Sequence, residues 1–190
     1  LNEGRRLPLL LADLARWPHG LQVIVIDGGS RDQTTAVADL AGAKTLTSPE
    51  RGRGQQLIEG MAAARHDWTL VLHADSRLPP GWCRAVQQVM QSPQARRDAW
   101  YFDFQVEARG PMLWLLERCV ALRSGLGQRP YGDQGLLIHR TLYTASGGYR
   151  PIPLMEDLDL VERIARQHRL RRLGCPLAVS YTHLTLPTSS

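Results

Sequence analysis

The sequence has 190 residues, of which 43% are hydrophobic and 22% are charged, so it can form one domain with a full core and is not typical of a disordered chain. The formal net charge of +5 favours anionic partners such as nucleotides, phospholipid head groups or nucleic acid. The three cysteines are far apart and form no CxxC pair, which argues against a disulfide scaffold or a zinc site and indicates reduced thiols in a cytosolic protein.

Strands and helices are predicted to alternate through residue 91. The apolar pattern predicts helices over 7–17, 32–41, 55–64 and 79–91, and strands over 21–26, 43–47 and 68–72. This alternation predicts an α/β fold with a mostly parallel sheet and helices on both faces. Because ligands of such sheets bind beyond the carboxyl ends of the strands, Asp27 and Asp75, which each follow a buried strand, are expected to share a ligand.

The second half of the chain is less regular. We expect strands over 99–108, 135–139 and 173–179, and helices over 112–122 and 156–167. Neither a repeat nor a linker divides the chain, so residues 1–180 are predicted to form one domain. Residues 181–190 are polar and rich in Thr and Ser, and we interpret them as a loose or non-native tail.

The first motif is the turn IDGGSRDQT, which follows a β-branched strand. Asp27 can accept hydrogen bonds from a base or ribose, and Gly28 and Gly29 let backbone amides approach a ligand closely. Asp32 suits a helix cap, so a plain strand–turn–helix is an alternative interpretation.

Two further acidic stretches carry candidate chemistry. Asp75 directly follows a buried strand, where its carboxylate suits Mg²⁺ or Mn²⁺, although a turn before the Pro79-Pro80 pair explains it equally well. Glu156, Asp157 and Asp159 open a helix, where negative charge is favourable, and a carboxylate there could also take a proton from an attacking hydroxyl.

Together these motifs resemble the family 2 glycosyltransferases of the GT-A fold. The turn at 27–34 is similar to the nucleotide-binding turn of that family, with Gly28 in place of its second acid. Residues 73–75 are similar to its D-x-D metal motif, with His73 in place of the first acid, and 156–157 are similar to its E-D motif.

The start of the chain bears on the same resemblance. Asn2-Glu3 matches an Asn-Glu pair that follows the first strand of the family, and the chain begins at Leu1 without that strand. We therefore expect truncation at the N-terminus, with loss of an inner strand of the sheet and of the support of Glu3. The His-Ala-Asp variant of the metal motif at 73–75 and the stretch 131–135 are similar to sequences of a bacterial subgroup called selenodomain-associated transferase 2.

The resemblance implies an inverting glycosyltransferase that moves a sugar from a nucleotide-diphosphate sugar to an acceptor hydroxyl with the help of Mn²⁺ or Mg²⁺. The implied catalytic residues are Asp157 as base and Glu156 as its support, and the implied metal ligand is Asp75. The implied nucleotide-binding residues are Asn2, Glu3, Asp27, Gly28, Ser30, Arg53 and Ala74. The implied acceptor-binding residues are Tyr131, Gly132, Asp133 and Gln134.

Expectations for the partners and the location complete this interpretation of the sequence. The acceptor is a small molecule or a lipid-linked one, nucleic acid is not expected, and the location is cytoplasmic. A peripheral contact with the inner face of the membrane and a homodimer are left open. The alternatives are a nucleotide-sugar-binding module without catalysis and a nucleotidyltransferase, although the chain lacks the glycine-rich phosphate loop with a lysine that is typical of the latter.

Overall fold

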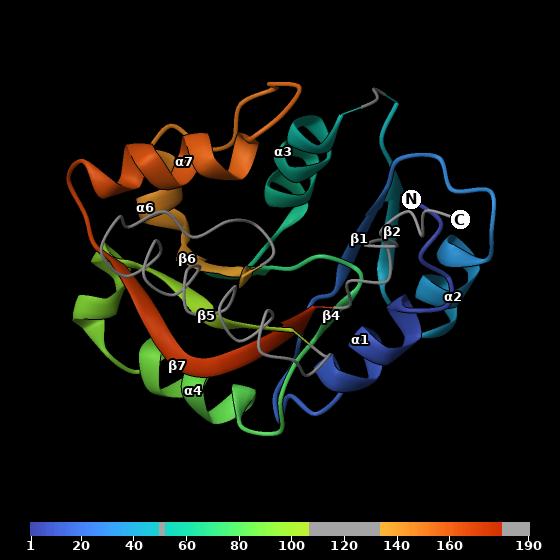
Figure 1. The fold of residues 1–190 in the computed structure, drawn as a ribbon, viewed down its shortest axis with the longest axis horizontal. Coiled ribbons are helices and arrows are strands. Elements are labelled where there is room, and N and C mark those ends of the chain that lie inside the picture. Colours follow the sequence, from blue (N-terminus) through green and yellow to red (C-terminus); the bar gives the residue numbers. More distant parts are fainter. Residues whose placement is uncertain (50–51, 107–133, 180–190) are drawn as a thin grey trace, which may run out of the picture.

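The computed structural model describes residues 1–49, 52–106 and 134–179 of the chain (Figure 1). The elements through α4 are α1 (Leu7–Leu14), β1 (Ile24–Asp27), α2 (Thr34–Leu40), β2 (Lys44–Thr47), α3 (Arg53–Ala63), β3 (Trp68–Val71), β4 (Ser76–Arg77) and α4 (Trp82–Met90). The later elements are η1 (Pro93–Arg97), β5 (Ala99–Val106), β6 (Leu136–His139), α6 (Arg140–Ala145), α7 (Glu156–Ala165) and β7 (Leu170–Val179). The predicted helix over 112–122 and the predicted tail lie outside the described residues.

The segments with a clear apolar pattern form the predicted helices and strands, although the first and last residues of these elements differ from the prediction. α1 stops at Leu14, three residues before the predicted end, in turns that precede Pro18. β7 begins earlier than predicted because Arg171 and Arg172 pair with β5 residues while their side chains stay exposed. The short elements β4, η1 and α6 were not predicted, since a few mostly polar residues carry no clear period.

The strands form two sheets, which contain both parallel and antiparallel pairs. β1 and β2 form a parallel two-stranded sheet, and the second sheet has the order β3-β6-β5-β7-β4. In that sheet β5 and β7 are parallel, whereas β6 is antiparallel to β3 and β5, and β4 is antiparallel to β7.

No strand pairing joins the two sheets within the described residues. The expected truncation at the N-terminus stays a prediction. Glu3, in contrast, keeps support: its backbone N–H donates to Thr34 Oγ1 at 2.9 Å.

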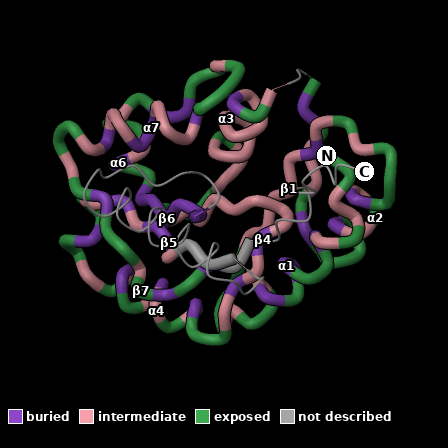
Figure 2. Tube along the Cα trace, in the orientation of Figure 1, coloured by how far each residue is buried: buried purple, intermediate pink, exposed green. Residues whose placement is uncertain are grey.

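Helices cover both faces of the larger sheet, as predicted (Figure 1). Because successive strand side chains point to opposite faces, Trp100 and Phe102 pack with α4, whereas Ala99 and Tyr101 pack with α6 and α7. Buried positions concentrate on the central strands, and all four residues of β6 are buried (Figure 2). No helix in the described ranges has the length and hydrophobicity needed to cross a bilayer.

Candidate active site

The turn after β1 is held by the carboxylate of Asp27, which is only 5% exposed. Asp27 Oδ2 accepts from the backbone N–H groups of Gly29 and Ser30 at 2.9 and 2.7 Å, and Oδ1 accepts from Ser30 Oγ at 2.5 Å. Burial alone would raise the pKa of Asp27, but these hydrogen bonds outweigh it and hold the pKa below its ordinary value. Both oxygens of Asp27 are therefore engaged inside the turn, and its predicted contact with a base or ribose stays a prediction.

The Asn2-Glu3 pair is joined to the same turn. The backbone N–H of Asn2 donates to Ser30 Oγ at 2.8 Å, and Asn2 Oδ1 accepts from the N–H of Arg31 at 2.9 Å. Asp32, which was expected to be structural, accepts from the N–H groups of Gly4 and Thr34, each at 3.0 Å. The predicted nucleotide-binding residues from both segments therefore lie together.

Gly28, which stands where the family has its second acid, lies beside the end of the Gln56 side chain. A Cβ at this position would lie 2.1 Å from Nε2 of Gln56 on α3. An acidic side chain would therefore have to displace the Gln56 amide, and the contact shows that the turn meets the first turns of α3.

His73 and Asp75 follow β3, at the end of the strand predicted for them. Burial, and then the nearby Arg53 guanidinium, lower the pKa of His73 to about 4, so its imidazole is neutral at pH 7. Asp75 Oδ2 lies 3.8 Å from Nη1 of Arg6, and the same nitrogen lies 4.0 Å from Glu3 Oε2. Ala74, predicted to contact nucleotide, packs against the core shared by α1 and α2.

Arg53 connects the metal motif with the base motif. Its Nε lies 3.0 Å from Glu156 Oε1 and its Nη2 lies 2.6 Å from Asp157 Oδ2. The same Nη2 makes a close contact with Nε2 of His73. The structure thus brings together four side chains from three segments. They are Arg53 from α3, His73 from the end of β3, and Glu156 and Asp157 from α7.

The third acid of α7 has a different environment. Asp159 Oδ2 accepts from Arg163 Nη2 at 2.7 Å, and Asp159 Oδ1 lies 3.5 Å from Arg150 Nη1. Arg163 also donates to the carbonyl oxygen of Gly148 at 2.6 Å. Asp159 therefore ties α7 to the preceding loop, while Glu156 and Asp157 face Arg53.

The residues that could hold a divalent cation are few. Residues 1–49, 52–106 and 134–179 contain no group of three or more His, Cys, Asp or Glu side chains arranged to hold a metal ion. Asp75 offers a carboxylate, whereas the lone pair of the neutral His73 imidazole faces Arg53 Nη2. Asp75 alone fits a cation that takes most of its ligands from phosphate and water, as Mg²⁺ and Mn²⁺ commonly do.

The predicted acceptor site is described only at its last residue, because 131–133 lie outside the described residues. Gln134 is 1% exposed and its side-chain amide donates to the carbonyl oxygen of Phe102 at 3.3 Å. Gln134 therefore belongs to the packed interior beside β5, and its role toward an acceptor stays a prediction.

Two residues near this site were missed by the sequence analysis. Arg6 pairs with Asp75, and its i,i+3 spacing from Glu3 was an available signal. Tyr149 is 5% exposed, and its hydroxyl has no hydrogen-bond partner in the described part of the chain. No sequence signal marks that hydroxyl, because its burial results from tertiary packing.

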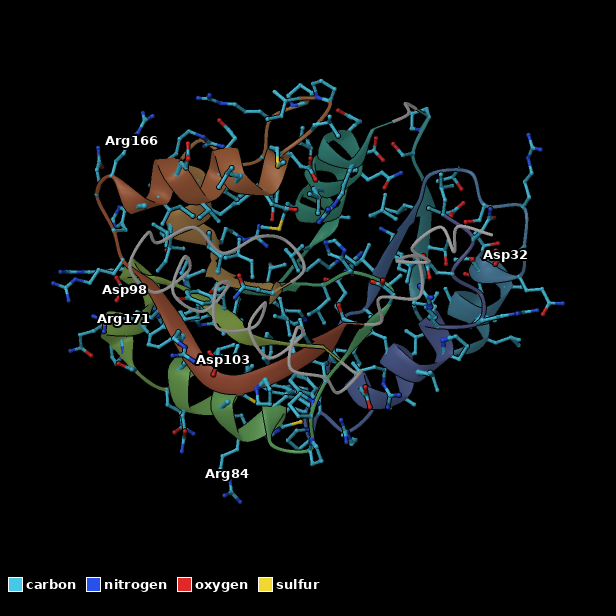
Figure 3. All side chains as sticks on the ribbon, viewed as in Figure 1. Asp32, Arg84, Asp98, Asp103, Arg166 and Arg171 are labelled. Atoms are coloured by element: carbon cyan, nitrogen blue, oxygen red, sulfur yellow. The ribbon has the colours of Figure 1, made fainter. Side chains whose placement is uncertain are left out.

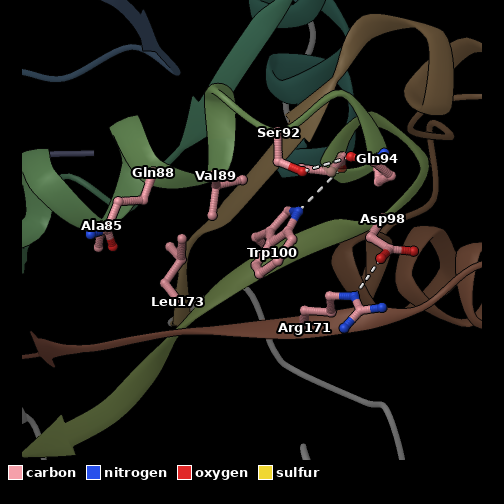
Figure 4. A pocket seen from close by; sticks show the side chains of 10 residues that line it. Ala85, Gln88, Val89, Ser92, Gln94, Asp98, Trp100, Arg171 and Leu173 are labelled. Atoms are coloured by element: carbon pink, nitrogen blue, oxygen red, sulfur yellow. Dashed lines mark hydrogen bonds and ion pairs between the residues drawn. The ribbon is translucent and has the colours of Figure 1, made fainter.

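A hollow of about 420 Å³ lies elsewhere, between α4 and the starts of β5 and β7 (Figure 4). Several of its polar side chains already have partners: Trp100 Nε1 donates to the carbonyl oxygen of Ala95 at 3.2 Å, and Arg171 pairs with Asp98. Asp98 and Arg171 lie at the opposite end of the molecule from Asp32 (Figure 3). None of the predicted site residues lines this hollow.

Residues 1–116, more than half of the chain, match the family described as Glycosyl transferase family 2. The chain belongs to glycosyl transferase family 2. A curated relative of this family 2 chain, named uncharacterized glycosyltransferase Mb0553 of Mycobacterium bovis, is 35% identical over 81 residues. That match covers 43% of the chain and only 36% of the relative, so the chain spans about a third of the length of this relative.

Solved structures confirm the GT-A fold for the family 2 chain. The mannosyltransferase PcManGT from Pyrobaculum calidifontis, in complex with GDP-Man and Mn²⁺, has a TM-score of 0.68 at 17% identity over 92% of this chain and 53% of its own. Glucosyl-3-phosphoglycerate synthase from Mycobacterium tuberculosis, in complex with Mn²⁺, UDP-glucose and phosphoglyceric acid, has a TM-score of 0.64 at 22% identity over 92% and 67%. At these identities the likeness shows the fold alone.

Proposed function

We propose that this chain carries the catalytic domain of an inverting glycosyltransferase, with Asp157 as the base. The observation that carries the proposal is the Arg53 cluster, which joins the Glu156-Asp157 pair to His73 and thus to the loop that holds Asp75. A base and a diphosphate site must lie on either side of one sugar in such a reaction, and this cluster spans both motifs.

The donor would be a nucleotide-diphosphate sugar. Cationic Arg53 and the neutral His73 imidazole lie beside the loop where the diphosphate would bind, and the turn at 27–30 lies against α3. A divalent cation at Asp75, when bound, would stabilise the negative charge of the leaving diphosphate. The neighbours whose complexes contain GDP-Man or UDP-glucose together with Mn²⁺ support this choice of donor and metal.

The reaction step assigns one role to Asp157. Its carboxylate accepts the proton of the acceptor hydroxyl as the oxygen forms a bond with the anomeric carbon. The bond from that carbon to the diphosphate oxygen breaks, and the nucleoside diphosphate leaves with the electron pair. Attack from the face opposite the leaving group inverts the anomeric centre. Glu156, which is 3% exposed and shares Arg53, would orient Asp157.

The remaining assignments of the chain are also proposals. Residues 1–180 would form the single domain, the narrower subgroup would be the selenodomain-associated transferases, and the acceptor would be a small molecule or a lipid-linked one. A cytoplasmic location with a peripheral membrane contact, and a homodimer, belong to the same proposal.

Replacement of the base tests the mechanism. Asp157→Asn should reduce turnover by about 10²- to 10⁴-fold, the usual contribution of general base catalysis, without weakening donor binding. Turnover is measured as release of nucleoside diphosphate from a panel of sugar nucleotides with and without Mn²⁺, and binding is measured by calorimetry.

The alternatives give different results in the same assay. A binding module without catalysis would bind a sugar nucleotide but release no nucleoside diphosphate, and a nucleotidyltransferase would release pyrophosphate from a nucleoside triphosphate. Equal losses of binding and turnover in Asp157→Asn would show that Asp157 is structural.

A further inference from the structure

Arg53 contacts three groups that belong to different parts of the proposed reaction. It is the first residue of α3, and its guanidinium reaches the carboxylates of Glu156 and Asp157 at 3.0 and 2.6 Å. Its Nη2 also meets His73, two residues before Asp75. One cation is therefore shared between the proposed base and the loop where the donor diphosphate would bind.

The partners of this cluster differ in their freedom to move. The Arg53 side chain is 42% exposed, whereas the side chains of Asp157 and Glu156 are 13% and 5% exposed. The guanidinium can thus swing toward the solvent side of the site while the carboxylates stay in place. Because the guanidinium is half exposed, it can exchange these carboxylates for a phosphate group that enters from the solvent side.

We propose that Arg53 is a latch that responds to the donor: it holds Glu156 and Asp157 when the site is empty and moves to the diphosphate when a nucleotide-diphosphate sugar binds. The inference rests on the proposed function, because it needs that donor and Asp157 as base. The latch makes Asp157 available to an acceptor hydroxyl only after the donor is in place.

The chemistry of the guanidinium favours the exchange. Arginine forms paired hydrogen bonds with phosphate oxygens as readily as with carboxylates, and a diphosphate carries more negative charge than either acid. A carboxylate that is held by a guanidinium is a weaker proton acceptor than a free one. Departure of Arg53 therefore strengthens the base at the moment when it is needed.

One further polar group is buried near these acids, the hydroxyl of Tyr149. The Tyr149 hydroxyl is buried without a hydrogen-bond partner among the described residues. Burial, together with the negative charge of Asp157, raises the pKa of Tyr149 well above its ordinary value, so the hydroxyl keeps its proton.

The test is a double-mutant cycle on nucleotide affinity. UDP, GDP, ADP, CDP and dTDP are titrated with Mn²⁺ by calorimetry, and the nucleotide that binds the wild type is used for all variants. Asp157→Asn should tighten its Kd about two- to fivefold, because it removes a competitor of up to about 1 kcal/mol for Arg53. Arg53→Gln should weaken the Kd, and in that background Asp157→Asn should have no effect.

A matched control separates the latch from a general effect of charge. Asp159→Asn removes the same charge two residues along α7, but Asp159 pairs with Arg163 and Arg150 instead of Arg53. Its Kd should equal that of the wild type. If Asp157→Asn does not fold, Glu156→Gln removes the other carboxylate of the latch and gives the same test.

Each outcome has a distinct meaning. Equal tightening by Asp159→Asn, tightening that persists in the Arg53→Gln background, or no tightening by Asp157→Asn overturns the latch and leaves the proposed function intact. Failure of every nucleotide to bind the wild type overturns the proposed function and the latch with it.

Discussion

The carboxylate of Asp27 is buried at the end of β1, where it accepts three hydrogen bonds from Gly29 and Ser30. These bonds fix the turn that presents Gly28 toward α3. An acid whose folded-state pKa is below its ordinary value of 3.8 stabilises the fold fully above that pH. The contribution is lost as the pH falls through the lower, folded-state pKa.

Asp27→Asn should therefore destabilise the folded state by an amount that depends on pH. We expect a loss of about 1 to 3 kcal/mol in the free energy of unfolding at pH 7, the cost of weakened bonds to a buried charged group. The difference from the wild type should shrink below pH 4, where the wild-type carboxylate also begins to take a proton. Urea unfolding at several pH values measures it, with the exposed Asp39→Asn as a control for charge. A difference that stays constant down to pH 3 would contradict this explanation.

The sequence marked most of the acids of the site but not their partners. Asp75, Glu156 and Asp157 were found because acids that follow a buried strand or open a helix are conspicuous. The Arg53 pairings could not be predicted, because they join residues more than 100 positions apart through the packing of α3 on α7. The burial of the Tyr149 hydroxyl likewise results from tertiary packing and could not be predicted.

At the scale of elements, α3 is the part that assembles the site. A Cβ on Gly54 would lie 2.6 Å from the carbonyl oxygen of Arg150, so backbone of the loop before α7 packs directly on α3. Farther along the same helix, Gly60 lies against Ile26 of β1. The helix thus connects β1, the nucleotide turn and α7.

Gly54→Ala should separate α3 from this loop. The overlap is with backbone, which cannot turn aside, so we expect a loss of about 1 to 3 kcal/mol in stability, as overpacking usually gives, and weaker nucleotide binding. Gly20→Ala is the control, because a Cβ there has no atom within 4 Å and should leave stability nearly unchanged. Thermal unfolding and calorimetry measure both effects, and equal behaviour of the two variants would contradict the role of Gly54.

Long apolar segments were predictable as elements, whereas their pairing was not. The strand at Trp68–Val71 was predicted with an end one residue too long, because its apolar residues are bounded by polar ones. The antiparallel direction of β6 could not be predicted, since it depends on which strands lie beside it. Alternation of strand and helix indicates a parallel sheet only while each strand is followed by a crossover.

At the scale of the whole molecule, the β1–β2 pair and the five-stranded sheet are linked through helices, not through shared strand pairing among the described residues. Two-stranded sheets are marginally stable, so this part should open more readily than the rest. In hydrogen exchange, amides of β1 and β2 should exchange at least about tenfold faster than those of β5 and β6, a difference of 1.4 kcal/mol in opening. Equal protection of both sheets would show that they open as one unit.

We propose that Arg53, Asp75 and Asp157 surround one sugar nucleotide. The most direct measurement is release of nucleoside diphosphate from a panel of sugar nucleotides by the wild type, Asp75→Asn and Asp157→Asn, with and without Mn²⁺. We predict that at least one sugar nucleotide is cleaved in the presence of Mn²⁺ and that both substitutions reduce its cleavage, Asp157→Asn by about 10²- to 10⁴-fold. Cleavage that persists in Asp157→Asn and Asp75→Asn at the wild-type rate would contradict the claim.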